Sequence, residues 1–318
     1  RERVDADRDA QVAVARQALG AVRERLLAAR NQRVQPALDD KVITAWNAMM
    51  LRSFAEAGRA LDRQEYVRIA ERNAEFLLGQ LWQEGELLRT YRQGEAKIPA
   101  FLDDYALLID ALVSLYQATF DPRWISFATE LADAMLERFW STEDETFYDT
   151  AEGTQDLIVR PREMNDSATP SGTSAAATAL LRLGALTGSS AYLETAEKVV
   201  GSLAEMAQRF PQAFGEMLTA IDLYLDGMQE VAIVGPAEAD GTRQLLDTMS
   251  TEYWPRAVTA FQAVSNGQSE AGAAVPLLEG RNPVDGAAAA YVCRRFTCQR
   301  PVTSPEALRR SLQEASRA

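Results

Sequence analysis

The sequence predicts a mainly α-helical fold, an α/α toroid made of repeated helical hairpins, with a small α/β unit near the C-terminus. Three observations support this prediction. One amphipathic stripe occurs three times, an apolar helix precedes each copy, and a strand–helix–strand pattern occurs only towards the C-terminus. The 318 residues suit one large domain or two ordinary ones, and 47% apolar with 25% charged residues exclude wholesale disorder.

The repeated stripe begins at three aromatic residues, Tyr66, Trp124 and Tyr192. Apolar residues follow each of them at offsets of four, eight and eleven, which trace one face of an α-helix. These residues are Ala70, Ala74 and Leu77, then Ala128, Ala132 and Met135, then Ala196, Val200 and Leu203. Each copy is therefore expected to bury the same face.

A second apolar helix precedes each copy, at about residues 41–60, 103–118 and 172–187, and a short turn joins the pair. The hairpin repeats at roughly 60–70 residues, longer than the roughly 20–50 residues of most solenoid repeats. This length and the irregular connections favour a closed toroid over an open solenoid. Helices near 4–30 and 212–225 extend the array.

Strand-like patches at 87–92 and 157–160 lie in the connections between hairpins, which should gather at one mouth of the array. We expect the toroid part to cover residues 1–228. Residues 229–318 are expected to form a strand, a helix and a second strand, followed by a last helix, all packed on the toroid.

The composition excludes several function classes. The net charge of −13 argues against a nucleic-acid partner, and no apolar run is long enough to span a membrane. The absence of histidine removes His-based catalysis and most zinc sites, so we expect neither a metal site nor a cofactor. Two cysteines are too few for a disulfide scaffold and suggest a reducing, cytoplasmic setting.

Cys293 and Cys298 are spaced C-x4-C, whereas a thioredoxin-type redox site is spaced C-x-x-C. Two ligands cannot complete a closed zinc site. We expect structural thiols, with redox pairing as the alternative.

Acidic residues precede or open each first helix of a hairpin. Asp40, Asp104 and Asp166 are separated by 64 and 62 residues, which is close to the repeat length. A single aspartate can cap a helix, but doubled carboxylates such as Asp103 and Asp104 exceed that need. We therefore predict Asp40, Asp104 and Asp166 as catalytic acids facing a common cavity, with helix capping as the alternative.

Neighbouring side chains are predicted to bind the substrate. Asp39, Asp103, Asn47 and Ser171 flank the acids, and Lys41 is expected to be an ion-pair partner of the double aspartate. Arg160 and Arg162 lie in a connection and could clamp an anionic group, or they could simply be solvated. Trp46 and Tyr105 could provide an aromatic platform for a sugar ring, or they could fill the core.

Several of these motifs occur in a fixed order along the chain. They are Asp39-Asp40-Lys41 with Thr44-Ala45-Trp46-Asn47, Phe101 to Ala106, Asp166 to Ser171, and Ala290 to Cys293 with Cys298 and Pro301. From about residue 25 to the C-terminus, this set resembles the spermatogenesis-associated, thioredoxin-domain-containing family.

The resemblance implies a thioredoxin-like domain upstream of this chain, followed by a toroid of the six-hairpin glycosidase and N-acylglucosamine 2-epimerase type. It also implies that the toroid is incomplete here, because its first hairpins and their histidines lie upstream.

We expect an enzyme that acts on a carbohydrate or similar polyol by hydrolase- or lyase-type acid/base chemistry. Epimerisation is disfavoured, because toroid epimerases use histidines. The alternative is a non-catalytic binding or scaffold module for the thioredoxin-like domain. The expected partners are thus a carbohydrate-like small molecule and the upstream domain.

Overall fold

The computed structural model describes residues 2–154, 157–265, 268–269 and 275–315. These residues form two compact units, Arg1–Asp40 and Lys41–Ala318. The first unit consists of helix α1 (Glu2–Asn31) and an extended segment up to Asp40. From residue 8 onward its side chains are exposed.

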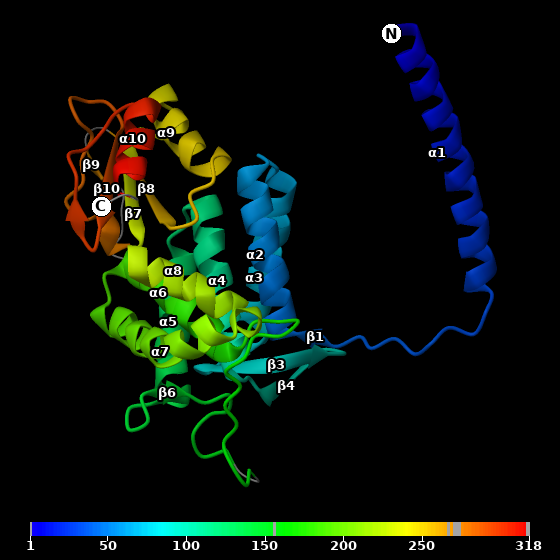
Figure 1. Cartoon of the computed structure of the whole chain (residues 1–318), viewed down its shortest axis with the longest axis horizontal. Helices are drawn as coiled ribbons and strands as arrows, with labels where there is room; N and C mark the ends of the chain where they lie inside the picture. Colours follow the sequence, from blue (N-terminus) through cyan, green and yellow to red (C-terminus); the bar gives the residue numbers. More distant parts are fainter. Residues whose placement is uncertain (1, 155–156, 266–267, 270–274, 316–318) are drawn as a thin grey trace. The chain divides into compact units, whose positions relative to one another are not determined.

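The second unit begins with three helical hairpins (Figure 1). They pair α2 (Thr44–Ala60) with α3 (Gln64–Gln80), α4 (Leu102–Thr119) with α5 (Arg123–Phe139), and α6 (Gly172–Thr187) with α7 (Ser190–Arg209). A further helix, α8 (Gly215–Asp226), follows a 3-10 turn at Pro211–Ala213. Helices α2, α4, α6 and α8 pack side by side in that order, and each outer helix packs on its own partner. This is the hairpin arrangement of an α/α toroid, so the predicted fold class is confirmed.

The predicted stripe is buried in all three outer helices, which confirms the repeat. Trp124 and Tyr192 are buried, and all nine apolar residues that follow the three aromatic residues are at most 5% exposed. Two of the inner helices end at a residue in the left-handed backbone conformation: Phe120 follows α4, and Gly188 follows α6. Glycine adopts this conformation without a Cβ clash, whereas at Phe120 the surrounding packing must enforce it.

Short sheets occupy the connections. Strands β1 (Val42–Ile43), β2 (Trp82–Gln83), β3 (Glu86–Arg92) and β4 (Glu95–Pro99) pair antiparallel around β3, and β5 (Trp140–Ser141) pairs with β6 (Thr146–Phe147). The strand-like patch at 87–92 is therefore a strand. The patch at 157–160 is not, because its side chains find no apolar face to cover and remain mostly exposed.

The C-terminal part is a small α/β layer, as expected. Its sheet has the order β11 (Thr297–Cys298), β10 (Ala289–Arg294), β7 (Gln229–Gly235), β8 (Ala257–Ser265) and β9 (Gln268–Ser269). Strands β7 and β8 are parallel, and α9 (Asp240–Thr251) connects them. Helix α9 and α10 (Pro305–Ala315) cover one face of the sheet, while α6 contacts β7 and β8. A 3-10 turn, Pro276–Leu278, precedes β10.

A long-range hydrogen bond ties the sheet to the inner helices. The buried side chain of Gln117 in α4 accepts the backbone N–H of Thr259 in β8 at 2.9 Å. Phe120 and Phe261 make an edge-to-face contact beside it. The expected change of character at residue 229 falls between α8 and β7, within one compact unit. Among the described residues, no helix is long and apolar enough to cross a bilayer.

Candidate functional site

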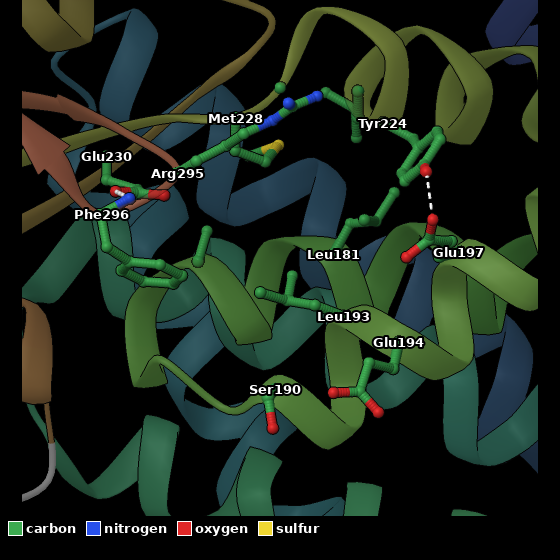
Figure 2. A pocket seen from close by; sticks show the side chains of 13 residues that line it. Leu181, Ser190, Leu193, Glu194, Glu197, Tyr224, Met228, Glu230, Arg295 and Phe296 are labelled. Carbon is green, nitrogen blue, oxygen red and sulfur yellow. Dashed lines mark hydrogen bonds between the residues drawn. The ribbon is translucent and has the colours of Figure 1, made fainter.

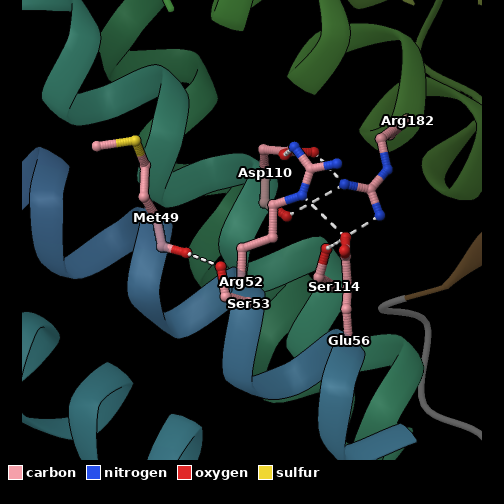
Figure 3. A network of polar contacts seen from close by, with 7 residues as sticks. All are labelled: Met49, Arg52, Ser53, Glu56, Asp110, Ser114 and Arg182. Carbon is pink, nitrogen blue, oxygen red and sulfur yellow. Dashed lines mark hydrogen bonds and ion pairs between the residues drawn. The ribbon is translucent and has the colours of Figure 1, made fainter. Parts of the chain in front are cut away.

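The inner helices carry a network of charged side chains where they meet (Figure 3). We call Arg52, Glu56, Asp110, Ser114 and Arg182 the inner network. Arg52 contacts Asp110 at 2.6 Å and Glu56 at 2.8 Å, and Arg182 contacts both Asp110 and, at 3.1 Å, the Ser114 hydroxyl. The Ser114 hydroxyl in turn donates to Glu56 at 3.2 Å. Three neighbouring inner helices are thereby cross-linked by charge.

Asp110 is the centre of this network. Its side chain is only 4% exposed, yet it faces two guanidinium groups. Burial alone would raise its pKa, but the charges of Arg182 and Arg52 outweigh this and hold the pKa of Asp110 below its ordinary value. Asp110 is therefore an anion that positions Arg52 and Arg182.

A cavity of about 260 Å³ opens beside the network, between the inner helices. It is lined by Met49, Arg52, Ser53, Leu107, Asp110, Pro170, Ala175 and Glu216, which come from α2, α4, α8 and the start of α6. We call it the inner cavity. Trp46 lies one helical turn before Met49 and is 59% exposed. Trp46 is therefore not part of the core, and its role as an aromatic platform stays a prediction.

Glu216 is the carboxyl group in the cavity that has no ion-pair partner among the described residues. It is half-buried, and burial together with the charge of Asp110 raises the pKa of Glu216 above its ordinary value. Its backbone N–H donates to Asp166 Oδ2 at 2.8 Å, and so does the N–H of Met217 at 3.2 Å. Asp166 thus caps α8 and fixes the first turn that carries Glu216.

Asp104 is also a cap, although its carboxyl is fully buried. It accepts the N–H of Ala45 at 2.9 Å and of Phe101 at 3.0 Å, and it pairs with Arg89 at 2.6 Å. Burial and the nearby charge of Asp103 raise the pKa of Asp104 to about 6 despite Arg89. The raised pKa is the sign expected for a functional acid, but the hydrogen bonds are those of a cap that joins α2 to α4.

The three predicted acids do not occupy equivalent helical positions. Asp104 is the third residue of α4, Asp166 precedes α6 by six residues, and Asp40 precedes α2 by four. Asp39 and Asp40 belong to the first compact unit and are exposed, as is Lys41 in the second. Their equal spacing in sequence therefore arises from connections of different length. The catalytic role of Asp40, Asp104 and Asp166 stays a prediction.

The remaining predicted residues contact other parts of the molecule. Tyr105 is buried, and its hydroxyl accepts the N–H of Leu87. Asn47 donates to Ile43 O and accepts from Asn73 of α3, while Asp103 pairs with Arg89 at 2.9 Å. Ser171 is the N-cap of α6 and accepts the N–H of Ser174.

The two arginines of the second connection both lie over the ring of Tyr148. Arg160 also donates to Thr150 O at 2.7 Å, so its guanidinium is used to hold the connection together. Arg162 is exposed, which fits both the anion clamp and the solvated alternative, so its binding role stays a prediction.

Sequence reasoning missed Arg52, Asp110, Arg182 and Glu216. The sequence did contain a signal for Asp110 and Arg182, because both are charged residues inside otherwise apolar helical runs. Such residues are almost never buried without a partner.

The expectation of free structural thiols is wrong. Cys293 and Cys298 face each other across the β10–β11 pair and form a disulfide. A two-residue turn places Cys293 opposite Cys298 on the two antiparallel strands. The C-x4-C spacing alone did not show that these residues form such a hairpin. In the described part of the chain, no group of three or more acidic or cysteine side chains could hold a metal ion.

Comparison with known proteins gives clear sequence relatives. Spermatogenesis-associated protein 20 of Homo sapiens is 30% identical over 300 residues, covering 91% of this chain and 38% of that protein. An uncharacterised protein of Caenorhabditis elegans is 28% identical over 306 residues, 93% of this chain and 41% of its own length. The chain thus spans about two fifths of these relatives, and no family model matches it.

Solved structures show local likeness at low identity. A cellobiose 2-epimerase from Spirochaeta thermophila is 16% identical, with a TM-score of 0.43 over 51% of this chain and 43% of that one. An unsaturated glucuronyl hydrolase from Bacillus sp. GL1 is 19% identical, with a TM-score of 0.43 over 55% and 50%. The sequence relatives identify the chain more specifically: it is a homologue of part of spermatogenesis-associated protein 20.

Proposed function

We propose that the inner cavity binds a neutral carbohydrate or similar polyol and that Glu216 supplies acid/base chemistry there. The observation that carries this proposal is the pairing of two unlike carboxyl groups in one cavity. Two arginines hold the pKa of Asp110 below its ordinary value, whereas burial raises the pKa of Glu216 above its ordinary value. Carboxyl groups whose pKa values are pushed apart are typical of acid/base sites.

The charge balance favours a neutral substrate. In the inner network, the two guanidiniums of Arg52 and Arg182 face the two carboxylates of Glu56 and Asp110. These charges cancel, so the inner network itself offers no net positive charge to attract a uronic acid or a phosphate.

Binding groups are available for hydroxyls. The side chain of Arg52 remains 36% exposed, and a guanidinium carries five N–H donors, more than its two acidic partners use. Ser53 lies on the cavity wall, and Trp46 offers an apolar face one turn away. Polar groups beside an aromatic platform match the alternating polar and apolar surface of a sugar.

In this proposal Asp166 and Asp104 are positioning residues. Asp166 holds the first turn of α8 and thereby Glu216, and Asp104 holds the first turn of α2, the helix that carries Arg52. Both roles agree with the capping alternative for these acids. A non-catalytic binding module remains the second candidate, and turnover separates the two.

Isothermal titration against neutral and uronic mono- and disaccharides tests the proposal on the chain and on the full-length protein. We expect binding heats with neutral sugars only. Glu216→Gln should bind them at least tenfold more weakly or lose turnover, whereas Glu205→Gln should keep the affinity and turnover of the wild type. Glu205 is a matched control, because it is an exposed glutamate of α7 outside the cavity. Equal heats for wild type and Glu216→Gln would sink the proposal, and binding without turnover would favour the second candidate.

A further inference from the structure

A second cavity, of about 360 Å³, lies between helices α6, α7 and α8 and the tip of the β10–β11 hairpin (Figure 2). We call it the hairpin pocket. Its lining is mostly apolar: Leu181, Ala185, Leu193, Leu223, Met228 and Phe296. This size falls in the range of small-molecule sites. None of its lining residues belongs to the inner cavity.

One wall of the pocket is a turn held in an unfavourable conformation. Arg295 and Phe296 are the two central residues of the hairpin turn, with φ of 49° and 60°. Such turns favour Asn-Gly, because side chains with a bulky Cβ substituent resist positive φ. Here the Cys293–Cys298 disulfide closes the hairpin, and the Phe296 N–H donates to Glu230 Oε2 at 3.0 Å. Strain that the surroundings enforce is concentrated at functional sites.

Acidic groups outnumber basic ones around the pocket. Glu194, Glu197 and Glu230 contribute to its lining, against the single guanidinium of Arg295. Arg294 and Arg295 both lie beside Gly227, the residue that follows α8, where the negative end of the helix dipole attracts a guanidinium. A ligand anion would therefore compete with the helix for the Arg295 guanidinium, whereas a ligand cation would meet an excess of carboxyl groups in the pocket lining.

Glu230 provides the deepest of these carboxyl groups. Glu230 is only 3% exposed, and it lies on β7 where this strand lines the apolar pocket. Burial raises the pKa of Glu230 to about 7, because two backbone N–H groups and the charge of Arg281 only partly offset the loss of hydration. Near the rim, the hydroxyl of Tyr224 donates a hydrogen bond to Glu197, and the ring of Tyr224 lies at the edge of the pocket (Figure 2).

We propose that the hairpin pocket binds a small organic amine with an apolar or aromatic body. The body packs against Leu181, Leu193 and Phe296, and the ammonium group donates to the carboxylate of Glu230. Aromatic rings in the wall add a favourable surface for a cation. This site is independent of the carbohydrate proposal, because the two cavities share no residue.

Three probes with one phenylethyl body test the charge preference by isothermal titration: 2-phenylethylamine, 2-phenylethanol and 3-phenylpropionate. We expect the amine to bind at least tenfold more tightly than the alcohol, and the carboxylate to bind most weakly. Glu230→Gln keeps the shape of the side chain and should reduce amine affinity about tenfold while leaving the alcohol unchanged. Glu238→Gln, an exposed glutamate outside the pocket, is the matched control.

A blocking variant locates the binding site. Ser190 is exposed at the pocket wall, so Ser190→Trp should abolish binding of the amine without altering the melting temperature. Equal affinity for the amine and the alcohol, unchanged amine binding in Ser190→Trp, or no amine binding at millimolar concentration would each overturn the proposal.

Discussion

The inner cavity and the hairpin pocket each contain a nearly completely buried carboxyl group, but the two groups respond to burial in opposite ways. Asp110 lies between two guanidiniums, and its pKa is below the ordinary value. Glu230 is held mainly by backbone N–H groups, and its pKa is raised to about 7. The comparison teaches that burial raises the pKa of both acids and that the charge of the partners decides whether this rise is overcome.

Removing the charge of Asp110 should have the largest effect. Asp110→Asn leaves Arg52 and Arg182 buried against a neutral amide, which should cost about 3–5 kcal/mol of unfolding free energy. Urea denaturation measures this. Asp240→Asn is the control, because Asp240 is 82% exposed and should change stability by less than about 0.5 kcal/mol. A loss below about 1 kcal/mol for Asp110→Asn would contradict the buried network.

The same acid determines the response to low pH. Because the folded pKa of Asp110 lies below its unfolded value, its ionisation stabilises the fold above the ordinary pKa of about 3.9. This contribution is lost as the pH falls through the depressed folded value.

Asp104→Asn comes next and tests whether the predicted catalytic acid is a cap. It replaces the carboxylate oxygen that accepts the Phe101 N–H and pairs with Arg89 by an amide NH2 group, and the loss of these hydrogen bonds should cost about 1–3 kcal/mol by urea denaturation. Affinity for neutral sugars should fall only modestly, because Asp104 acts on the inner cavity only through the first turn of α2. If stability is retained but sugar binding or turnover is lost, Asp104 acts at the site and the capping assignment is wrong.

The disulfide provides a way to alter the hairpin pocket alone. Replacing both Cys293 and Cys298 by serine removes a short closed loop and should cost about 2 kcal/mol. Amine binding should weaken several-fold because the strained turn is released, whereas sugar turnover should be intact. Lost turnover with an unchanged melting temperature would place the cysteines in the chemistry instead.

The smallest expected effect concerns the pH dependence of stability at Glu230. Its folded pKa of about 7 exceeds its unfolded value, so the folded state loses stability as the pH rises through 7. Between pH 6 and 8, the unfolding free energy of the wild type should therefore fall by about 1 kcal/mol more than that of Glu230→Gln, as measured by urea denaturation at each pH. The charges nearest to Glu230 are those of Arg281 and of the rim groups Glu194, Glu197 and Arg295. An identical pH profile for variant and wild type would show that Glu230 does not titrate in this window.

Local periodicity was sufficient to predict the hairpins. The stripe after Trp124 is a regular 3.6-residue pattern, and its burial follows from that pattern alone. The C-terminal strand, helix and strand were also predictable from local sequence, because residues 231–234 of β7 form a continuous apolar run.

The site was less predictable, because its geometry depends on contacts between distant segments. Asp110 and Arg182 are 72 residues apart, and neither residue shows its partner in the sequence. Glu216 stands at the start of an ordinary amphipathic helix, and only the cap from Asp166, 50 residues away, connects it to the predicted acids. Equal spacing suggested a common role for Asp40, Asp104 and Asp166, but spacing does not record where each helix begins.

The hydrogen bond from Thr259 to Gln117 has a consequence for how the chain folds. The two residues are 142 positions apart, so the side-chain amide of Gln117 has no Thr259 partner until β8 has been synthesised and has docked on α4. Pairing over such a distance requires the closure of a long loop, and this slows folding. During synthesis the hairpins therefore complete their packing only after the sheet has formed. A chain that ends before β8 would keep its helices but would expose the ring of Phe120, which packs on Phe261, and the side-chain amide of Gln117.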